Sequence, residues 1–118
     1  MTELITLVST GKGSWGHVSR LINEGTWENI VILTNDFGKE KFTNGKNAQM
    51  VVIDSKKPIM ELVEDIKNLL KDKIKGTEVA VNFVSGDGKE HMALISALLK
   101  LGLAIRLVAL TQEGIKEI

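Results

Sequence analysis

The sequence lacks cysteine and tyrosine, contains one proline, and carries no net charge. The absence of cysteine excludes disulfides, thiolate metal sites and cysteine nucleophiles. Because 15 basic residues balance 15 acidic ones, no field across the whole molecule attracts nucleic acid or an anionic membrane. No apolar run approaches the roughly 20 residues of a membrane span, and no N-terminal stretch has the form of a signal peptide. We therefore expect a cytoplasmic protein with no DNA, long-RNA or membrane partner.

Short apolar runs separated by helical patterns set the expected fold. The runs are typical of buried strands and cover residues 4–8, 30–33, 50–53, 79–84 and 105–110. Strands that alternate with helices predict an α/β fold with right-handed crossovers. We expect a single Rossmann-like domain over residues 1–118, with a mostly parallel five-stranded sheet in the order 3-2-1-4-5 and helices on both faces. The polar stretch 39–47 fits a short helix or a loop equally well.

The helix expected from Met92 to Leu101 is apolar around most of its circumference, more than one sheet face covers in so small a chain. The residues responsible are Ala93, Leu94, Ile95, Ala97, Leu98 and Leu99. Two interpretations remain open: the helix is clamped between the sheet and its neighbours, or part of it meets a partner. Two-fold pairing is the commonest assembly, so we expect a homodimer.

Two glycine-bearing loops follow the first and fourth expected strands. They read Ser9-Thr10-Gly11-Lys12-Gly13 and Ser85-Gly86-Asp87-Gly88-Lys89. In a doubly wound sheet these loops lie side by side where the strand order reverses, which is the usual ligand crevice. Each loop offers backbone N–H groups, a helix N-terminus and a lysine, a combination that suits a phosphate.

Other interpretations of the first loop compete with a plain phosphate site. Residues 11–16 match the dinucleotide pattern G-x-G-x-x-G, and Asp36 follows at about the ribose-binding distance. This pattern predicts a regulatory domain for NAD or an adenine nucleotide, although Lys12 and Trp15 are bulky for such a turn. A simple strand-to-helix turn is the third interpretation. Trp15 fits either stacking on an adenine or burial against the sheet edge.

The stretch from Val81 to Val108 resembles the second ligand motif of CARF domains, the CRISPR-associated Rossmann-fold sensors. A strand ends in the small-residue and glycine turn 85–89, an apolar helix begins near Met92, and Leu101-Gly102 precedes the next strand. The resemblance implies a stand-alone sensor domain of an antiviral response. It further implies a homodimer that binds one cyclic oligoadenylate across its two-fold axis, with no other cofactor.

The same resemblance implies the residues of the site. The ligand-binding residues that it implies are Ser9, Thr10, Gly11, Lys12 and Gly13 on the first loop, and Ser85, Gly86, Asp87, Gly88 and Lys89 on the second. Trp15 at the rim of the first loop and His91 close to the second complete the candidate set by their position. Asp87 departs from the pattern, because an acid repels phosphate unless it turns to a ribose hydroxyl or caps the helix. His91 fits a structural role better than a catalytic one. With two histidines and no cysteine, a metal site has little support.

Whether the ring is bound or cleaved stays open at this point. Cleavage requires donors to the developing oxyanion, and Ser9, Lys12 and Lys89 are the candidates for a metal-independent ring nuclease. A third kind of function is a non-catalytic small subunit whose apolar helix docks a larger protein.

Overall fold

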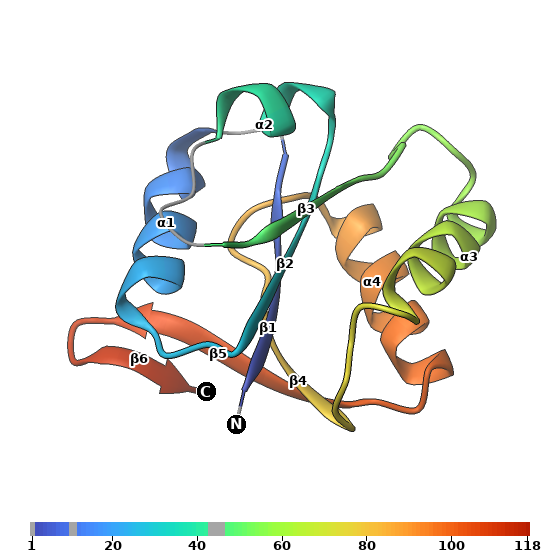
Figure 1. The fold of residues 1–118 in the computed structure, drawn as a ribbon. Helices are drawn as coiled ribbons and strands as arrows, with labels where there is room; N and C mark the ends of the chain where they lie inside the picture. Colours follow the sequence, from blue (N-terminus) through green and yellow to red (C-terminus); the bar gives the residue numbers. More distant parts are fainter. Residues whose placement is uncertain (1, 10–11, 43–46) are drawn as a thin grey trace.

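The computed structural model describes residues 2–9, 12–42 and 47–118. These residues form an α/β fold around one six-stranded sheet in the order β3-β2-β1-β4-β5-β6 (Figure 1). The strands are β1 (Glu3–Val8), β2 (Asn29–Thr34), β3 (Gln49–Val52), β4 (Glu78–Asn82), β5 (Ala104–Thr111) and β6 (Gly114–Glu117). The first five pair in parallel, and β6 pairs antiparallel with β5. The predicted order 3-2-1-4-5 is therefore confirmed for the first five strands.

The prediction of five strands is wrong, because β6 adds a sixth at the edge of the sheet. Gly114 has φ 103° and ends the two-residue turn from β5, a conformation that glycine adopts without strain. Ile115 pairs with Leu110 and packs against the core on the α1 side of the sheet. The strand is too short and too polar to form an apolar run, so periodicity alone does not reveal it.

Helices cover both faces of the sheet, as predicted. The helical segments are η1 (Lys12–Ser14, a 3₁₀ turn), α1 (Trp15–Glu24), α2 (Asp36–Lys41), α3 (Ile59–Leu70) and α4 (Gly88–Lys100). Figure 1 shows α3 and α4 together on one face and α1 on the other, with α2 at the carboxyl end of the strands. The apolar residues of α3 and α4 pack in one buried cluster and those of α1 in another.

The central strand β1 explains why the strand pattern is continuously apolar. All six of its residues are buried. Leu4 and Val8 face the cluster under α1, whereas Ile5 and Leu7 face the cluster under α3 and α4. A strand covered on both faces needs apolar side chains at successive positions rather than at alternate ones.

Two local expectations need correction or completion. The last helix begins at Gly88 and not at Met92, because Asp87 caps it and its polar first turn belongs to the helix. In the polar stretch 39–47, residues up to Lys41 belong to the short helix α2, while residues 43–46 lie outside the described part of the chain.

Candidate functional site

The carboxyl ends of β1 and β4 are neighbours in the sheet, and a loop leaves each of them. From β1 the chain continues through α1 toward β2, and from β4 it continues through α4 toward β5, on the opposite face (Figure 1). The strand order therefore reverses between these two strands. Crevices at such a reversal are the usual ligand sites of open α/β sheets.

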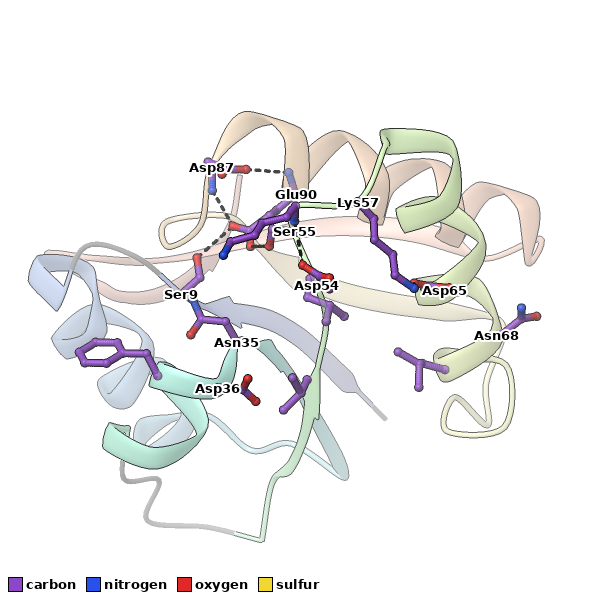
Figure 2. Close-up of a pocket in the computed structure, with 15 residues that line it drawn as sticks. Ser9, Asn35, Asp36, Asp54, Ser55, Lys57, Asp65, Asn68, Asp87 and Glu90 are labelled. Carbon is purple, nitrogen blue, oxygen red and sulfur yellow. Dashed lines mark hydrogen bonds and ion pairs between the residues drawn. The ribbon is translucent and has the colours of Figure 1, made fainter.

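Glu90 joins three segments at this edge. Its side chain is only 3% exposed, and its carboxylate accepts hydrogen bonds from the hydroxyls of Ser9 at 2.9 Å and Ser55 at 2.5 Å. It also accepts from the Asp87 amide at 3.0 Å, while Asp87 accepts from the Glu90 amide at 2.8 Å, which completes a capping box. As a carboxylate only accepts, both serines donate their hydroxyl hydrogen to it. The end of β1 and the loop between β3 and α3 are thus fixed to the start of α4 (Figure 2).

Lys89 holds the same β3–α3 loop. Its ammonium donates to the backbone carbonyl of Ser55 at 2.9 Å. The first turn of α4 therefore contacts Ser55 twice, once through its hydroxyl and once through its main chain. An ammonium carries three hydrogens, so Lys89 can also donate to a ligand phosphate beside this loop.

The second loop is fixed by contacts within itself. His91 Nε2 lies 2.8 Å from the carbonyl oxygen of Ser85, and because a carbonyl only accepts, this ring nitrogen carries hydrogen and donates. The imidazole packs on Phe83 with 4.9 Å between ring centroids. Gly86 has φ 98°, and a Cβ there would lie 3.0 Å from His91 Nε2 and 3.1 Å from Glu90 Oε1. Both the backbone conformation and the lack of space require glycine.

Asn82 ends β4 directly before this loop and links it to α1. Its Oδ1 accepts from the Val84 amide at 3.2 Å, and its Nδ2 donates to the Val108 carbonyl at 2.9 Å. The orientation of the amide is thereby fixed, and Nδ2 lies 3.3 Å from His17 Nε2, which therefore accepts. The Leu110 amide donates to the same nitrogen at 3.4 Å. Burial lowers the pKa of His17, in agreement with a neutral ring that accepts at Nε2.

A cleft of about 1030 Å³ opens beside these contacts (Figure 2). It lies between the carboxyl ends of β2 and β3, the start of α2, and helix α3. Its charged lining consists of Asp36, Asp54, Asp65, Asp87 and Glu90 with Lys56 and Lys57. Lys57 is paired with Asp65 at 2.8 Å. Carboxylates thus outnumber lysines, so the cleft suits groups that donate hydrogen bonds and disfavours a phosphate.

Only some of the predicted residues of the first loop are described by the structure. Thr10 and Gly11 lie outside the described residues, and of Lys12 only the backbone is described, as the first residue of η1. Ser9 is 2% exposed, and its hydroxyl hydrogen is bonded to Glu90. In this arrangement Ser9 positions other groups and does not offer a hydrogen to a ligand. Gly13, also in η1, is exposed.

Gly11 of the dinucleotide pattern lies outside the described residues, and the other two glycines of the pattern are not required by packing. A Cβ at Gly13 or at Gly16 would meet nothing within 4 Å. In a dinucleotide-binding domain the last glycine permits close packing of helix and strand, a need that does not exist at Gly16. Asp36 does lie at the cleft, just after β2, as the dinucleotide interpretation expects. The structure therefore supports one half of that pattern and not the other.

Trp15 is packed on the protein itself. Its indole nitrogen donates to the Ser9 carbonyl at 3.2 Å, and its ring contacts Phe37 and Phe42, with 5.7 Å between centroids in each pair. Of the two uses predicted for Trp15, burial is the one that these contacts favour.

The predicted residues of the second loop lie together in the structure. Ser85, Gly86, Asp87, Gly88 and Lys89 follow β4 at the expected edge, and His91 supports them. Asp87 caps α4, which is the capping alternative predicted for it. Ser85 is buried, and within the described part of the chain its hydroxyl has no hydrogen-bond partner.

Sequence reasoning missed Glu90, Ser55 and Phe37, all of which line the cleft. For Glu90 a signal existed: an aspartate followed three residues later by a glutamate, before an apolar run, is the pattern of a capping box. Ser55 and Phe37 carry no such local signal, because their roles depend on which loops meet in space.

In comparisons with known proteins, no family model and no curated protein matches the chain. Within residues 2–9, 12–42 and 47–118, no group of three or more His, Asp or Glu side chains is placed to hold a metal ion. None of the described helices is long and apolar enough to cross a membrane.

Proposed function

We propose that this protein is a sensor domain that binds a cyclic oligoadenylate at the carboxyl edge of the sheet, between β1 and β4. The observation that carries the proposal is the second loop. It lies at the strand-order reversal, is held by Gly86, Glu90 and His91, and stands beside a cleft large enough for a nucleotide. A rigid loop at this position binds a ligand with little ordering cost.

The charged residues around the cleft favour different positions for the nucleoside and the phosphates of the proposed ligand. The carboxylates of the cleft exclude phosphates, so the nucleoside occupies the cleft and the phosphates lie over the loops. Lys89 lies in the first turn of α4, at the end of the second loop, and its ammonium keeps hydrogens beyond the one given to Ser55. Lys12 enters the proposal from its place in the sequence. Among the described residues the buried hydroxyl of Ser85 has no hydrogen-bond partner, which favours a water or a ligand group at this loop, because such groups usually have a partner.

We propose binding rather than cleavage of the ring. Cleavage needs hydrogen-bond donors aimed at the developing oxyanion. The hydroxyl of Ser9, one of the predicted donors, already donates to Glu90, and its side chain is buried. The arrangement therefore favours a site that recognises the ring and leaves it intact.

A homodimer belongs to this proposal, because a ring of adenylates is itself symmetric. On α3 and α4, the exposed side chains Met60, Met92 and Leu99 form an apolar surface that the sheet does not cover. Met92 lies one turn after the start of α4, so this surface begins beside the second loop. In the proposed dimer the two-fold axis runs along α4, and both second loops face one ring.

The test is calorimetric titration of wild type and two single variants with cyclic tetra-adenylate, cyclic hexa-adenylate and NAD. Loss of a charge-assisted phosphate contact costs about 1.5–3 kcal/mol, so Lys89→Ala should weaken ring binding on the order of 10- to 100-fold. Lys75→Ala, which removes an exposed lysine beside Glu3 at the amino end of the sheet, is the matched control and should leave the affinity unchanged. Equal affinities of the Lys89→Ala variant and wild type would remove Lys89 from the site.

Two rival functions are separated by the same titrations. NAD binding that Asp36→Ala abolishes, without ring binding, would establish the nucleotide-regulated domain, since Asp36 is the part of the dinucleotide pattern that lies at the cleft. A monomer that binds no nucleotide would instead favour the small interaction subunit.

A further inference from the structure

Three aromatic side chains form a connected group at the rim of the cleft. Trp15 lies in the middle, in a tilted contact with Phe37 and an edge-to-face contact with Phe42. Phe42 is buried in the core under α1, and Trp15 is half-buried and bonded to the Ser9 carbonyl. Phe37 is 45% exposed and lines the cleft. The group thus passes from the core to the cleft and ends in an exposed ring.

The backbone beneath Phe37 is held firmly. Asn35 caps α2 by accepting from the Gly38 amide at 2.7 Å. A Cβ at Gly38 would lie 2.0 Å from Thr34 Oγ1 and 2.8 Å from the Val8 carbonyl oxygen, so only glycine allows α2 to approach the strand ends this closely. The ring of Phe37 is therefore presented on a fixed segment, supported by Trp15.

The cleft offers the rest of what a planar base requires. Two further partly exposed apolar side chains, Val52 and Leu69, line it together with Phe37. At the polar part of the lining, Asp36 and Asp54 are exposed carboxylates, which accept hydrogen bonds and cannot donate them. A base with an exocyclic amino group can stack on an aromatic face and donate from its edge.

We propose that Phe37 is the stacking platform for an adenine, and that Asp36 and Asp54 accept hydrogen bonds from its amino group. This inference rests on the proposed function for the identity of the ligand, and it assigns the base to a particular wall of the cleft. Trp15, for which stacking on a base was one of two interpretations from the sequence, supports the platform. The phosphates remain over the loops, away from these carboxylates.

Adenosine is the first probe, because it tests the base subsite without a ring or a phosphate. Proton NMR of the wild-type chain, with the Phe37 ring assigned, follows titration with adenosine, inosine and ribose 5-phosphate. We expect ring-current shifts of Phe37 with adenosine. Inosine, which lacks the amino group, should bind at least about tenfold more weakly, because the hydrogen bonds to both charged acceptors are lost. Ribose 5-phosphate should leave the Phe37 signals unchanged.

The second step compares ring binding by variants of matched exposure. Stacking is worth roughly 1–3 kcal/mol per base, so Phe37→Ala should weaken cyclic tetra-adenylate binding about 5- to 150-fold, and Phe37→Tyr should restore it. Leu107→Ala is the control, since Leu107 is 41% exposed and does not line the cleft. Circular dichroism of each variant verifies the fold.

The outcomes separate this inference from the proposed function. Adenosine shifts at Phe37 without any ring binding would uphold the base subsite and overturn the cyclic ligand. An unshifted Phe37 ring under saturating adenosine would overturn the inference. The inference would also be overturned if the Phe37→Ala variant bound the ring as tightly as wild type does. In that case the proposed function would still stand.

Discussion

Two glutamates are buried at opposite ends of the sheet, and each joins segments that are far apart in sequence. Glu3, at the amino end of β1, accepts from the amides of Lys75 and Gly76 at 2.9 and 3.0 Å and from the side chain of Asn29 at 3.3 Å. Glu90, near the carboxyl end of β1, accepts from two serine hydroxyls and an amide. The partners of Glu3 lie at the start of β2 and between α3 and β4, and none of them lines the cleft, whereas Glu90 and its partners do.

The comparison separates structural from functional use of the same chemistry. A buried carboxylate with three or more donors stabilises either end of the molecule. Only at the carboxyl edge does it also fix the loops that face a ligand crevice. A variant at Glu3 should therefore affect stability alone, and a variant at Glu90 should affect both stability and binding.

The largest expected effect comes from Glu90→Ala. It removes the hydrogen-bond partner of Ser9 and Ser55 and half of the capping box, so we expect a loss of about 3 kcal/mol in the free energy of unfolding. Urea denaturation measures this loss. Glu3→Ala, the matched variant at the other end, should lose about 2 kcal/mol, because water can reach the freed amides of its loop. Ring binding should disappear with Glu90→Ala and persist with Glu3→Ala, and the reverse pattern would break the comparison.

A smaller effect is expected from two glycine variants, one on the second loop and one in the first turn of α1. Gly86→Ala forces a left-handed φ and crowds His91 and Glu90, so it should cost about 1–3 kcal/mol. Gly16→Ala adds a methyl group in open space within α1 and should stabilise the protein by up to about 1 kcal/mol. Thermal unfolding of both variants gives the two signs. Equal effects would mean that the second loop is no more constrained than the first turn of α1.

Low pH should destabilise the fold at the amino end of the sheet, because Glu3 becomes protonated. Burial opposes ionisation of this carboxyl, but the amides of Lys75 and Gly76 outweigh it, and the pKa is lowered from its ordinary value of 4.5. The stabilisation is therefore present above pH 4.5 and is lost as pH falls through the lowered pKa of the folded state. Glu3→Gln should flatten the stability profile below this pH in urea denaturation. If the loss of stability at low pH were the same in Glu3→Gln as in wild type, other carboxyl groups would dominate that loss.

The smallest effect concerns His17, beside the second loop. Burial and the nearby charge of Arg20 lower its pKa from the ordinary 6.5, so its contribution is present above that pH and fades as pH falls toward the lowered pKa. His17→Gln supplies a non-titrating acceptor for Asn82 and Leu110. The free energy of unfolding of wild type, relative to that of this variant, should change by less than about 1 kcal/mol between pH 7.5 and 5. Ring binding followed over the same range would show whether this contact reaches the site.

Much of the fold follows from local pattern. The buried strands β1, β2 and β4 read as continuous apolar runs, and the glycine turns after β1 and β4 predict the strand-order reversal. β6 is not predictable in this way, because its pairing with β5 depends on the turn at Gly114 and on one apolar side chain, Ile115.

For the site, the sequence predicts the location but not the contacts that support it. The second loop could be located from its glycines and lysine, but its support by Glu90 and Ser55 requires the β3–α3 loop to come alongside α4. Ser9 looks like a free hydroxyl in the sequence and proves to be a buried donor to Glu90. Likewise, the sequence leaves Trp15 free to stack on a base, whereas in the structure its ring packs on Phe37 and Phe42. Each difference arises from tertiary contacts between segments that no local pattern connects.

The most direct test of the central claim is the stoichiometry of ring binding by the wild-type chain. Calorimetric titration with cyclic tetra-adenylate and cyclic hexa-adenylate, followed by chromatography of the recovered ligand, gives the number of chains per ring and the fate of the ring. The account predicts one intact ring for two chains. No heat with either ring, at concentrations where NAD binds, would contradict it.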